Sequence, residues 1–171
     1  MNDGPIAVVV PLYDFRDEEL NDLLDIFLQN GLSHQVVASV AGECVGIQGT
    51  RVDATYSFEQ ADAAQYSCVA LIGGPGTEAY LHNDSLHDFA RFFVEQNKIV
   101  AAICWAPAIL ANAGLLMKKN ATVWVGAKND LLTHGANYTG ADVTVDGNFL
   151  TADGPDSTIK FANTLVSMLI K

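Results

Sequence analysis

Short apolar runs alternate with segments of helical periodicity along most of this chain. The apolar runs are IAVVV (6–10), HQVVAS (34–39), SCVALI (67–72) and KIVAAI (98–103). In the gaps between these runs, residues 17–30 and 84–97 carry apolar side chains at helical spacing. Buried strands that alternate with helices are typical of a parallel sheet covered by helices on both faces. The alternation therefore predicts an α/β fold with a doubly wound, mostly parallel sheet.

The length and charge of the chain limit its organisation and its partners. Its 171 residues, 50% of them hydrophobic, fit one compact domain over residues 1–171. The 20 acidic and 9 basic side chains give a formal net charge of −11. A negative field of this size repels phosphate backbones and anionic membrane surfaces. We therefore expect neither a nucleic acid nor a membrane as a partner.

The N-terminal residues and the cysteines favour a cytoplasmic location. The apolar run at 6–10 is too short for a signal peptide or a membrane span, and no basic leader precedes it. The cysteines, Cys44, Cys68 and Cys104, are odd in number and lack the spacing of a metal site. A reducing cytoplasm suits this pattern better than a secreted disulfide framework does. We expect no bound metal and no cofactor.

Two turns of small residues follow predicted strands and lead into helices. They are LIGGPGTE (71–78) and AAICWAP (101–107). Ligands of open parallel sheets bind at the carboxyl ends of the strands, so these turns are expected to hold the functional site. In the second turn, Ala102 and Ala106 flank Cys104 at the spacing that a nucleophile on a sharp strand-to-helix turn requires. Cys104 is thus a candidate nucleophile, and the alternative is a cysteine that only packs in the core.

A reactive Cys104 needs a physical cause that favours its thiolate. An unperturbed thiol is mostly protonated at neutral pH. The start of the helix after Cys104 is expected to lower the pKa of the thiol, but only in part. A second group must therefore contribute.

Glu19 is the candidate for this second group. It shares its face of the first predicted helix with Leu23 and Ile26, whereas Glu18 lies on the solvated face. The pattern therefore predicts that Glu19 points inward. A buried, protonated carboxyl near Cys104 would donate a hydrogen bond that favours the thiolate. The alternative is a boundary glutamate whose carboxyl group reaches water.

Four segments, in this order, resemble the ThiJ/PfpI superfamily: FRDEELNDLLDIF, ALIGGPGTEAYL, AAICWAPAILANAGLL and NYTGADVTVDGNFLTADGP. The resemblance covers nearly the whole chain. It implies a flavodoxin-like fold with a cysteine on a nucleophile elbow, assembled as a homodimer or larger homo-oligomer. It also implies that Cys104 is the reactive cysteine and Glu19 a protonated glutamate. The backbone N–H groups of Gly74 and Trp105 correspond to the donors that hold an oxyanion.

The residue after the cysteine departs from this resemblance. The protease-like and glyoxalase-like branches have histidine there, whereas this chain has Trp105. An indole N–H donates a hydrogen bond but accepts no proton, so a cysteine–histidine dyad of that form is absent. This argues against a peptidase. Glu78 lies where some members place an acidic partner of that histidine, although charge stabilisation at a helix start is the simpler account.

Two further residues are candidates for the site. His82 lies near the glycine-rich turn and could approach the cysteine across a dimer interface. Arg51 lies in the stretch where a relative keeps an active-site arginine. An ordinary surface position is the simpler interpretation for both residues.

Three classes of function are compatible with a reactive Cys104. An enzyme would add the thiolate to a small carbonyl or acyl substrate, in a glyoxalase, deglycase or hydrolase type of reaction. A redox sensor would oxidise the thiolate, and protonated Glu19 would hold the product. A chaperone-like protein of the stress response would depend on its surface instead. The enzyme is the leading hypothesis, and an intracellular cysteine peptidase is the least favoured alternative because of Trp105.

Overall fold

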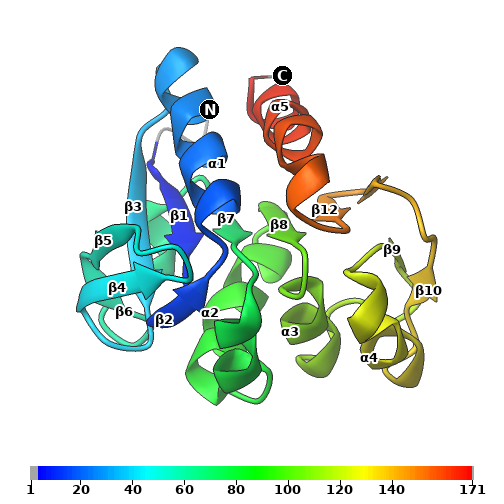
Figure 1. Ribbon diagram of the computed structural model, residues 1–171. Helices are drawn as coiled ribbons and strands as arrows, with labels where there is room; N and C mark the ends of the chain where they lie inside the picture. Colours follow the sequence, from blue (N-terminus) through cyan, green and yellow to red (C-terminus); the bar gives the residue numbers. More distant parts are fainter. Residues whose placement is uncertain (1–3, 171) are drawn as a thin grey trace.

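The computed structural model describes residues 4–170 and has a seven-stranded sheet at its centre (Figure 1). In sheet order, the strands are β11 (Val143–Asp146), β12 (Phe149–Ala152), β8 (Ile99–Ile103), β7 (Cys68–Leu71), β1 (Ile6–Val9), β3 (His34–Ala38) and β6 (Tyr56–Ser57). All neighbouring strands are parallel except β11, which runs antiparallel to β12. The mostly parallel sheet predicted from the sequence is therefore confirmed.

Helices cover both faces of this sheet. On one face, α1 (Asp17–Gln29) and α5 (Thr158–Leu169) lie side by side (Figure 1). The other face is covered by α2 (Asp84–Glu95), α3 (Pro107–Asn112) and α4 (Lys128–Thr133). This arrangement confirms the doubly wound α/β fold.

The residues of each central strand alternate between two apolar layers. In β1, Ile6 and Val8 pack in the layer beneath α1 and α5, while Ala7 and Val9 pack in the layer beneath α2, α3 and α4. Successive side chains of a strand point to opposite faces of the sheet. A strand covered on both faces must therefore be apolar at every position, which explains the continuous apolar runs.

Two smaller sheets and four 3-10 turns complete the structure. One sheet has the order β2 (Tyr13–Phe15), β4 (Gly42–Gly46), β5 (Arg51–Ala54), and the other pairs β9 (Asn120–Ala121) with β10 (Asn137–Tyr138). The 3-10 turns are η1 (Ala63–Gln65), η2 (Pro75–Tyr80), η3 (Val125–Ala127) and η4 (Pro155–Ser157). Both η2 and η4 begin at a proline that follows a glycine, directly beside the carboxyl edge of the central strands.

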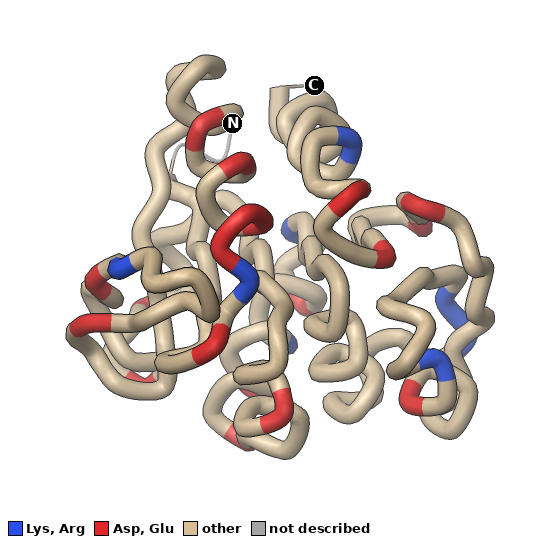
Figure 2. The backbone as a smooth tube through the Cα atoms, in the orientation of Figure 1, with Lys and Arg blue, Asp and Glu red and all other residues tan. Residues whose placement is uncertain are grey.

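Acidic residues lie at many separate places along the backbone and outnumber the basic residues (Figure 2). This distribution agrees with the formal net charge of −11. Within residues 4–170, no helix combines the length and the apolar character that crossing a membrane requires.

Candidate active site

Three chain segments meet at the carboxyl edge of the central strands. Gly73 and Gly74 follow β7, Cys104 follows β8, and α1 begins beyond the carboxyl end of β1. These strands are adjacent in the order β8–β7–β1. The backbone N–H of Arg16, just before α1, donates a 3.0 Å hydrogen bond to the carbonyl of Gly73. The two turns singled out in the sequence therefore lie side by side, together with the start of α1.

Cys104 has a backbone conformation that few residues other than glycine adopt. Its φ of 62° lies in the left-handed region. Its N–H donates to the carbonyl of Ala152 at 2.9 Å, and its own carbonyl accepts from the N–H of Trp124 at 2.8 Å. Ala102 and Ala106, which flank it, are fully buried. Cys104 thus has a strained backbone, is fixed by hydrogen bonds on its N–H and its carbonyl, and lies between a strand and a helix. This is the geometry of a nucleophile elbow.

The strain at Cys104 predicts an order of stability for two substitutions. Glycine adopts a left-handed φ without the steric cost of a Cβ atom, so Cys104→Gly is expected to be more stable than Cys104→Ala by about 1 kcal/mol. Urea unfolding of the two variants measures the difference. Both variants lack the thiol, so the difference in stability between them reports the cost of the backbone conformation. A glycine variant that is no more stable than the alanine variant would contradict strain at this position.

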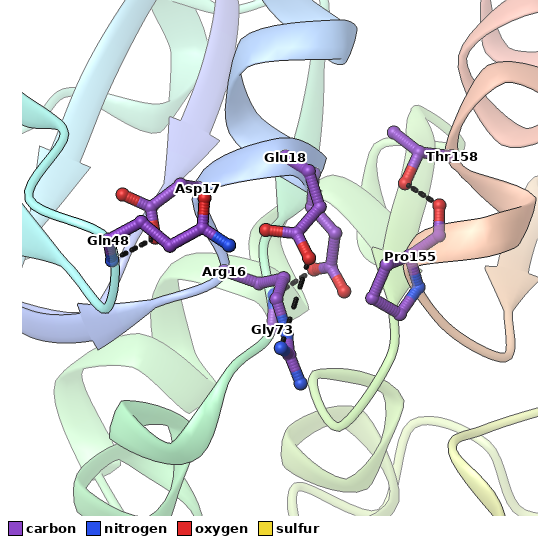
Figure 3. A network of polar contacts seen from close by, with 8 residues as sticks. Arg16, Asp17, Glu18, Gln48, Gly73, Pro155 and Thr158 are labelled. Carbon is purple, nitrogen blue, oxygen red and sulfur yellow. Dashed lines mark hydrogen bonds and ion pairs between the residues drawn. The ribbon is translucent and has the colours of Figure 1, made fainter.

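Glu19 is buried against the elbow. Its side chain lies on α1 and is 0% exposed. Oε2 accepts a 2.9 Å hydrogen bond from the N–H of Gly73, which is labelled in Figure 3. The Cys104 thiol is close enough to the carboxyl group for each group to shift the pKa of the other. Oε1 makes no hydrogen bond to any of the described residues. The alternative in which Glu19 reaches water is therefore wrong.

Burial controls the proton affinity of both groups. Burial raises the pKa of Glu19 to about 7, against the hydrogen bond from Gly73 and the nearby Cys104 thiol, which lower it. Burial and then the negative charge of ionised Glu19 raise the pKa of Cys104 to about 12, against the N–H groups of Trp105 and Gly74, which lower it. Between these two pKa values the pair holds one proton and one negative charge.

The pKa of the Cys104 thiol is raised overall, so the partial lowering expected from the start of the following helix does not decide its value. The following helix, α3, has only 6 residues, and its first residue is Pro107. Its dipole therefore acts weakly, whereas burial acts directly on the sulfur. The arrangement offers a different route to a thiolate, in which the thiol proton moves to Glu19. This transfer neutralises the carboxylate and leaves the charge on sulfur, facing the N–H groups of Gly74 and Trp105.

Cys104 lies in a pocket of about 400 Å³. The pocket is lined by Arg16, Gly74, Pro75, Cys104, Trp105, Trp124 and Pro155. The rings of Trp105 and Trp124 have centroids 5.8 Å apart and are tilted by 58°. Both indoles belong to the lining of this pocket. Cys104 is 5% exposed, so this pocket is the approach to the thiol.

A buried carboxylate fixes the beginning of α1. Asp17 is 2% exposed and accepts hydrogen bonds from the backbone N–H groups of Gln48 at 2.8 Å (Figure 3) and of Thr50 at 2.9 Å. Burial raises the pKa of Asp17, but these hydrogen bonds outweigh burial and lower it. Asp17 lies between Arg16 and Glu19 in the sequence, so this anchor helps to position Arg16 at the pocket and Glu19 against Gly73.

Glu78, His82 and Arg51 do not line the pocket. Glu78 and His82 are exposed on η2 and just beyond it. Arg51 is exposed on β5 and forms an ion pair with Glu43. These positions give the three residues no role at Cys104 within one chain, and a contribution of His82 from a second copy stays a prediction. Within residues 4–170, no group of three His, Cys, Asp or Glu side chains is placed to hold a metal ion.

The sequence does not identify three of the residues that line the pocket: Arg16, Trp124 and Pro155. For Arg16 a signal is present, because it directly precedes the helix that carries Glu19. Trp124 and Pro155 come from distant segments, and no local pattern marks them. Glu18 also differs from expectation, since its side chain is only 36% exposed and turns toward Arg16.

The fold and the site define a class of α/β proteins in which a cysteine on an elbow is paired with a buried glutamate. The model of the DJ-1/PfpI family matches residues 5–168, and the chain belongs to this family.

Several relatives match most of this chain in sequence, and a solved structure matches it in fold. An uncharacterized protein of Methanocaldococcus jannaschii is 38% identical over 159 residues, which cover 91% of this chain and 78% of the relative. A Bacillus subtilis protein whose name assigns it provisionally as a cysteine protease is 31% identical, covering 96% and 97%. Deglycase PfpI of Pyrococcus furiosus is 26% identical, covering 91% and 94%. The crystal structure of a ThiJ/PfpI domain protein from Brachyspira murdochii superposes with a TM-score of 0.95 at 30% identity, covering 97% and 96%.

Proposed function

We propose that this protein is a cysteine-dependent enzyme that acts on small carbonyl or acyl compounds, in a reaction of the glyoxalase or deglycase type. The contact between Glu19 and the Cys104 thiol carries this proposal, because it pairs a nucleophile with a group that can take its proton. The name of the Pyrococcus furiosus relative supports the same class of reaction.

The first chemical step forms a bond between sulfur and the substrate. With a 2-oxoaldehyde, the thiol proton moves to Glu19 and the sulfur attacks the aldehyde carbon. The π electrons of the carbonyl move to its oxygen, which then takes the proton from Glu19 to give a hemithioacetal. The N–H groups of Gly74 and Trp105, which point at the sulfur, stabilise the negative oxygen as it forms.

Glu19 also suits the next step as a general base. A carboxyl group with a pKa of about 7 can both accept and return a proton near neutral pH. It removes the proton from the carbon bonded to sulfur, and protonation of the neighbouring carbon gives the thioester of a 2-hydroxy acid. Water then cleaves the thioester, releases the acid and restores the thiol. The net reaction adds one water to the substrate and consumes no oxidant.

A small substrate suits this pocket better than a peptide does. The pocket of about 400 Å³ has the size of a small-molecule site. No histidine is among its lining residues, and the indole of Trp105 accepts no proton. The name of the Bacillus subtilis relative makes peptide cleavage the alternative outcome of an activity screen.

Redox sensing is a second candidate function, favoured by the same contact. Peroxide would convert Cys104 to a sulfinate, and protonated Glu19 could donate a hydrogen bond to the new oxygen atoms. The other cysteines lie deeper, since Cys44 and Cys68 are both 0% exposed and burial raises the pKa of each thiol.

A substrate screen tests the proposed enzyme. Methylglyoxal, glyoxal, an activated ester and an unstructured peptide are offered to the wild type, with Cys104→Ser as the blank and Cys44→Ala as the matched cysteine control. We expect the wild type and Cys44→Ala to convert a carbonyl or ester substrate above the blank and to leave the peptide intact. Equal rates for the wild type and Cys104→Ser with every substrate would contradict a Cys104-dependent enzyme.

A further inference from the structure

We infer that the pocket at Cys104 selects carbonyl compounds that carry a carboxylate beside the reacting carbon, and that Arg16 binds this carboxylate. The inference rests on the proposed function, because it assigns a substrate class to the same pocket. Glyoxylate, an aldehyde whose neighbouring carbon is a carboxylate, is the simplest compound of this class.

Arg16 is the one residue with a permanently charged side chain among those that line the pocket. Its Nε is buried and has no hydrogen-bond partner within the described part of the chain. Its Nη1 lies 3.8 Å from Oε1 of Glu18 (Figure 3), which is beyond hydrogen-bond distance. The guanidinium group therefore has N–H donors that this ion pair does not use.

Trp105 supplies a second donor without a partner. Its indole Nε1 is buried and has no acceptor among residues 4–170. Buried donors in folded proteins nearly always have an acceptor, from protein, water or ligand. Trp105 and Arg16 line the same pocket, so one ligand with several acceptor oxygens can serve both. A carboxylate has this chemistry, and it can accept two parallel hydrogen bonds from a guanidinium group.

The net negative charge of the chain makes anion binding at the pocket depend on Arg16. The chain has a formal net charge of −11, and Figure 2 shows that acidic residues outnumber basic ones along the backbone. Such a field disfavours anions in general, so selection for an anion has to come from a local cation. Glu18 competes for Arg16, but both side chains are 36% exposed and the pair is long, which makes the ion pair weak.

The substrate class also suits the proposed chemistry at Cys104. Addition of the thiol to glyoxylate forms a bond between sulfur and the aldehyde carbon, breaks the carbonyl π bond and moves the thiol proton to the oxygen. No oxidant is needed. The carboxylate is one bond away from the reacting carbon, and both groups have partners in the lining of a single pocket of about 400 Å³.

Two alkylating probes of similar size and different charge test the inference. Iodoacetate carries a carboxylate, whereas iodoacetamide is neutral, and peptide mass spectrometry measures the rate of each at Cys104. We expect the iodoacetate-to-iodoacetamide rate ratio to fall about fivefold in Arg16→Gln, because one positive charge near a partly exposed site is lost. Arg16→Lys keeps the charge and is expected to retain most of the ratio. Arg51→Gln, which removes an arginine outside the pocket lining, is the matched control and should leave it unchanged.

Protection by aldehydes separates this inference from the proposed function. Glyoxylate should slow iodoacetamide labelling of Cys104 in the wild type more than neutral glyoxal does, and Arg16→Gln should remove that preference. The role of Arg16 would be overturned if Arg16→Gln left both the iodoacetate-to-iodoacetamide ratio and the preference for glyoxylate unchanged. It would also be overturned if Arg16→Gln slowed iodoacetate and iodoacetamide equally. Either result would leave the proposed function in place. If neither aldehyde protects Cys104 and the substrate screen shows no turnover, the proposed function itself fails.

Discussion

Replacing Glu19 by glutamine is expected to slow the alkylation of Cys104 by iodoacetamide about a hundredfold near pH 8, the lower range for loss of a proton-transfer partner. In the wild type, Glu19 has a pKa of about 7 and can take the thiol proton above that pH. Glutamine cannot take a proton, so the thiol must ionise without this acceptor. Its pKa is still raised by burial, although the charge of Glu19, which also raises it, is gone, and we expect the loss of the proton acceptor to outweigh this relief. The wild-type rate should therefore rise through about pH 7, and the variant should show no inflection there.

Peptide mass spectrometry over a range of pH values measures these profiles at Cys104. Glu19→Leu, which lacks any hydrogen-bonding group, is expected to react more slowly than Glu19→Gln. The opposite result would contradict this prediction. If both neutral variants react faster than the wild type, the carboxylate suppresses the thiolate by its charge, and transfer of the thiol proton to Glu19 is not the route to reactivity.

The same substitution is expected to stabilise the folded protein by about 3 kcal/mol above about pH 8 and to have little effect below about pH 4. The pKa of Glu19 is raised from 4.5 to about 7 in the folded state. Below the lower value both states are protonated, so burial carries no ionisation penalty. As the pH rises, the unfolded state ionises first and the fold loses stability, until the loss is complete above the folded pKa. Glutamine does not titrate and can still accept the hydrogen bond from Gly73.

Urea unfolding of the wild type and Glu19→Gln at both pH extremes measures this difference. Asp17→Asn is a matched control on the same helix turn, because hydrogen bonds lower the pKa of Asp17 and its loss should destabilise the protein at neutral pH. A stability difference for Glu19→Gln that is independent of pH would contradict a raised pKa for Glu19. Together, the two expected results describe a site that is held at a cost in stability for the sake of reactivity.

Much of the fold was predictable because its physical requirements are local. A strand covered on both faces must be apolar throughout, and β1, β7 and β8 show such runs in the sequence. The inward position of Glu19 follows from the residues that share its helix face, and the elbow at Cys104 follows from the small residues on either side. These features depend on spacings of a few residues, which a sequence displays directly.

The features that the sequence did not predict depend on how deeply a side chain is buried and on contacts between distant segments. The spacing around Cys104 indicates a turn but not how deeply the sulfur is buried, and burial is what reverses the expected direction of its pKa shift. Trp124 directly precedes η3 and Pro155 begins η4, so both are far from Cys104 in the sequence. Only the folding of the whole chain brings them to the pocket. The two-residue strands β9 and β10 are too short to give a periodic pattern.

The pair of indoles beside Cys104 also gives the molecule an optical property. The sequence contains 2 tryptophans, Trp105 and Trp124, and both belong to the lining of this pocket. Tryptophan emission from the unmodified protein therefore originates at the candidate active site alone. A compound that enters the pocket changes the surroundings of every tryptophan fluorophore in the chain, so its arrival can be followed by intrinsic fluorescence, without a label and without turnover.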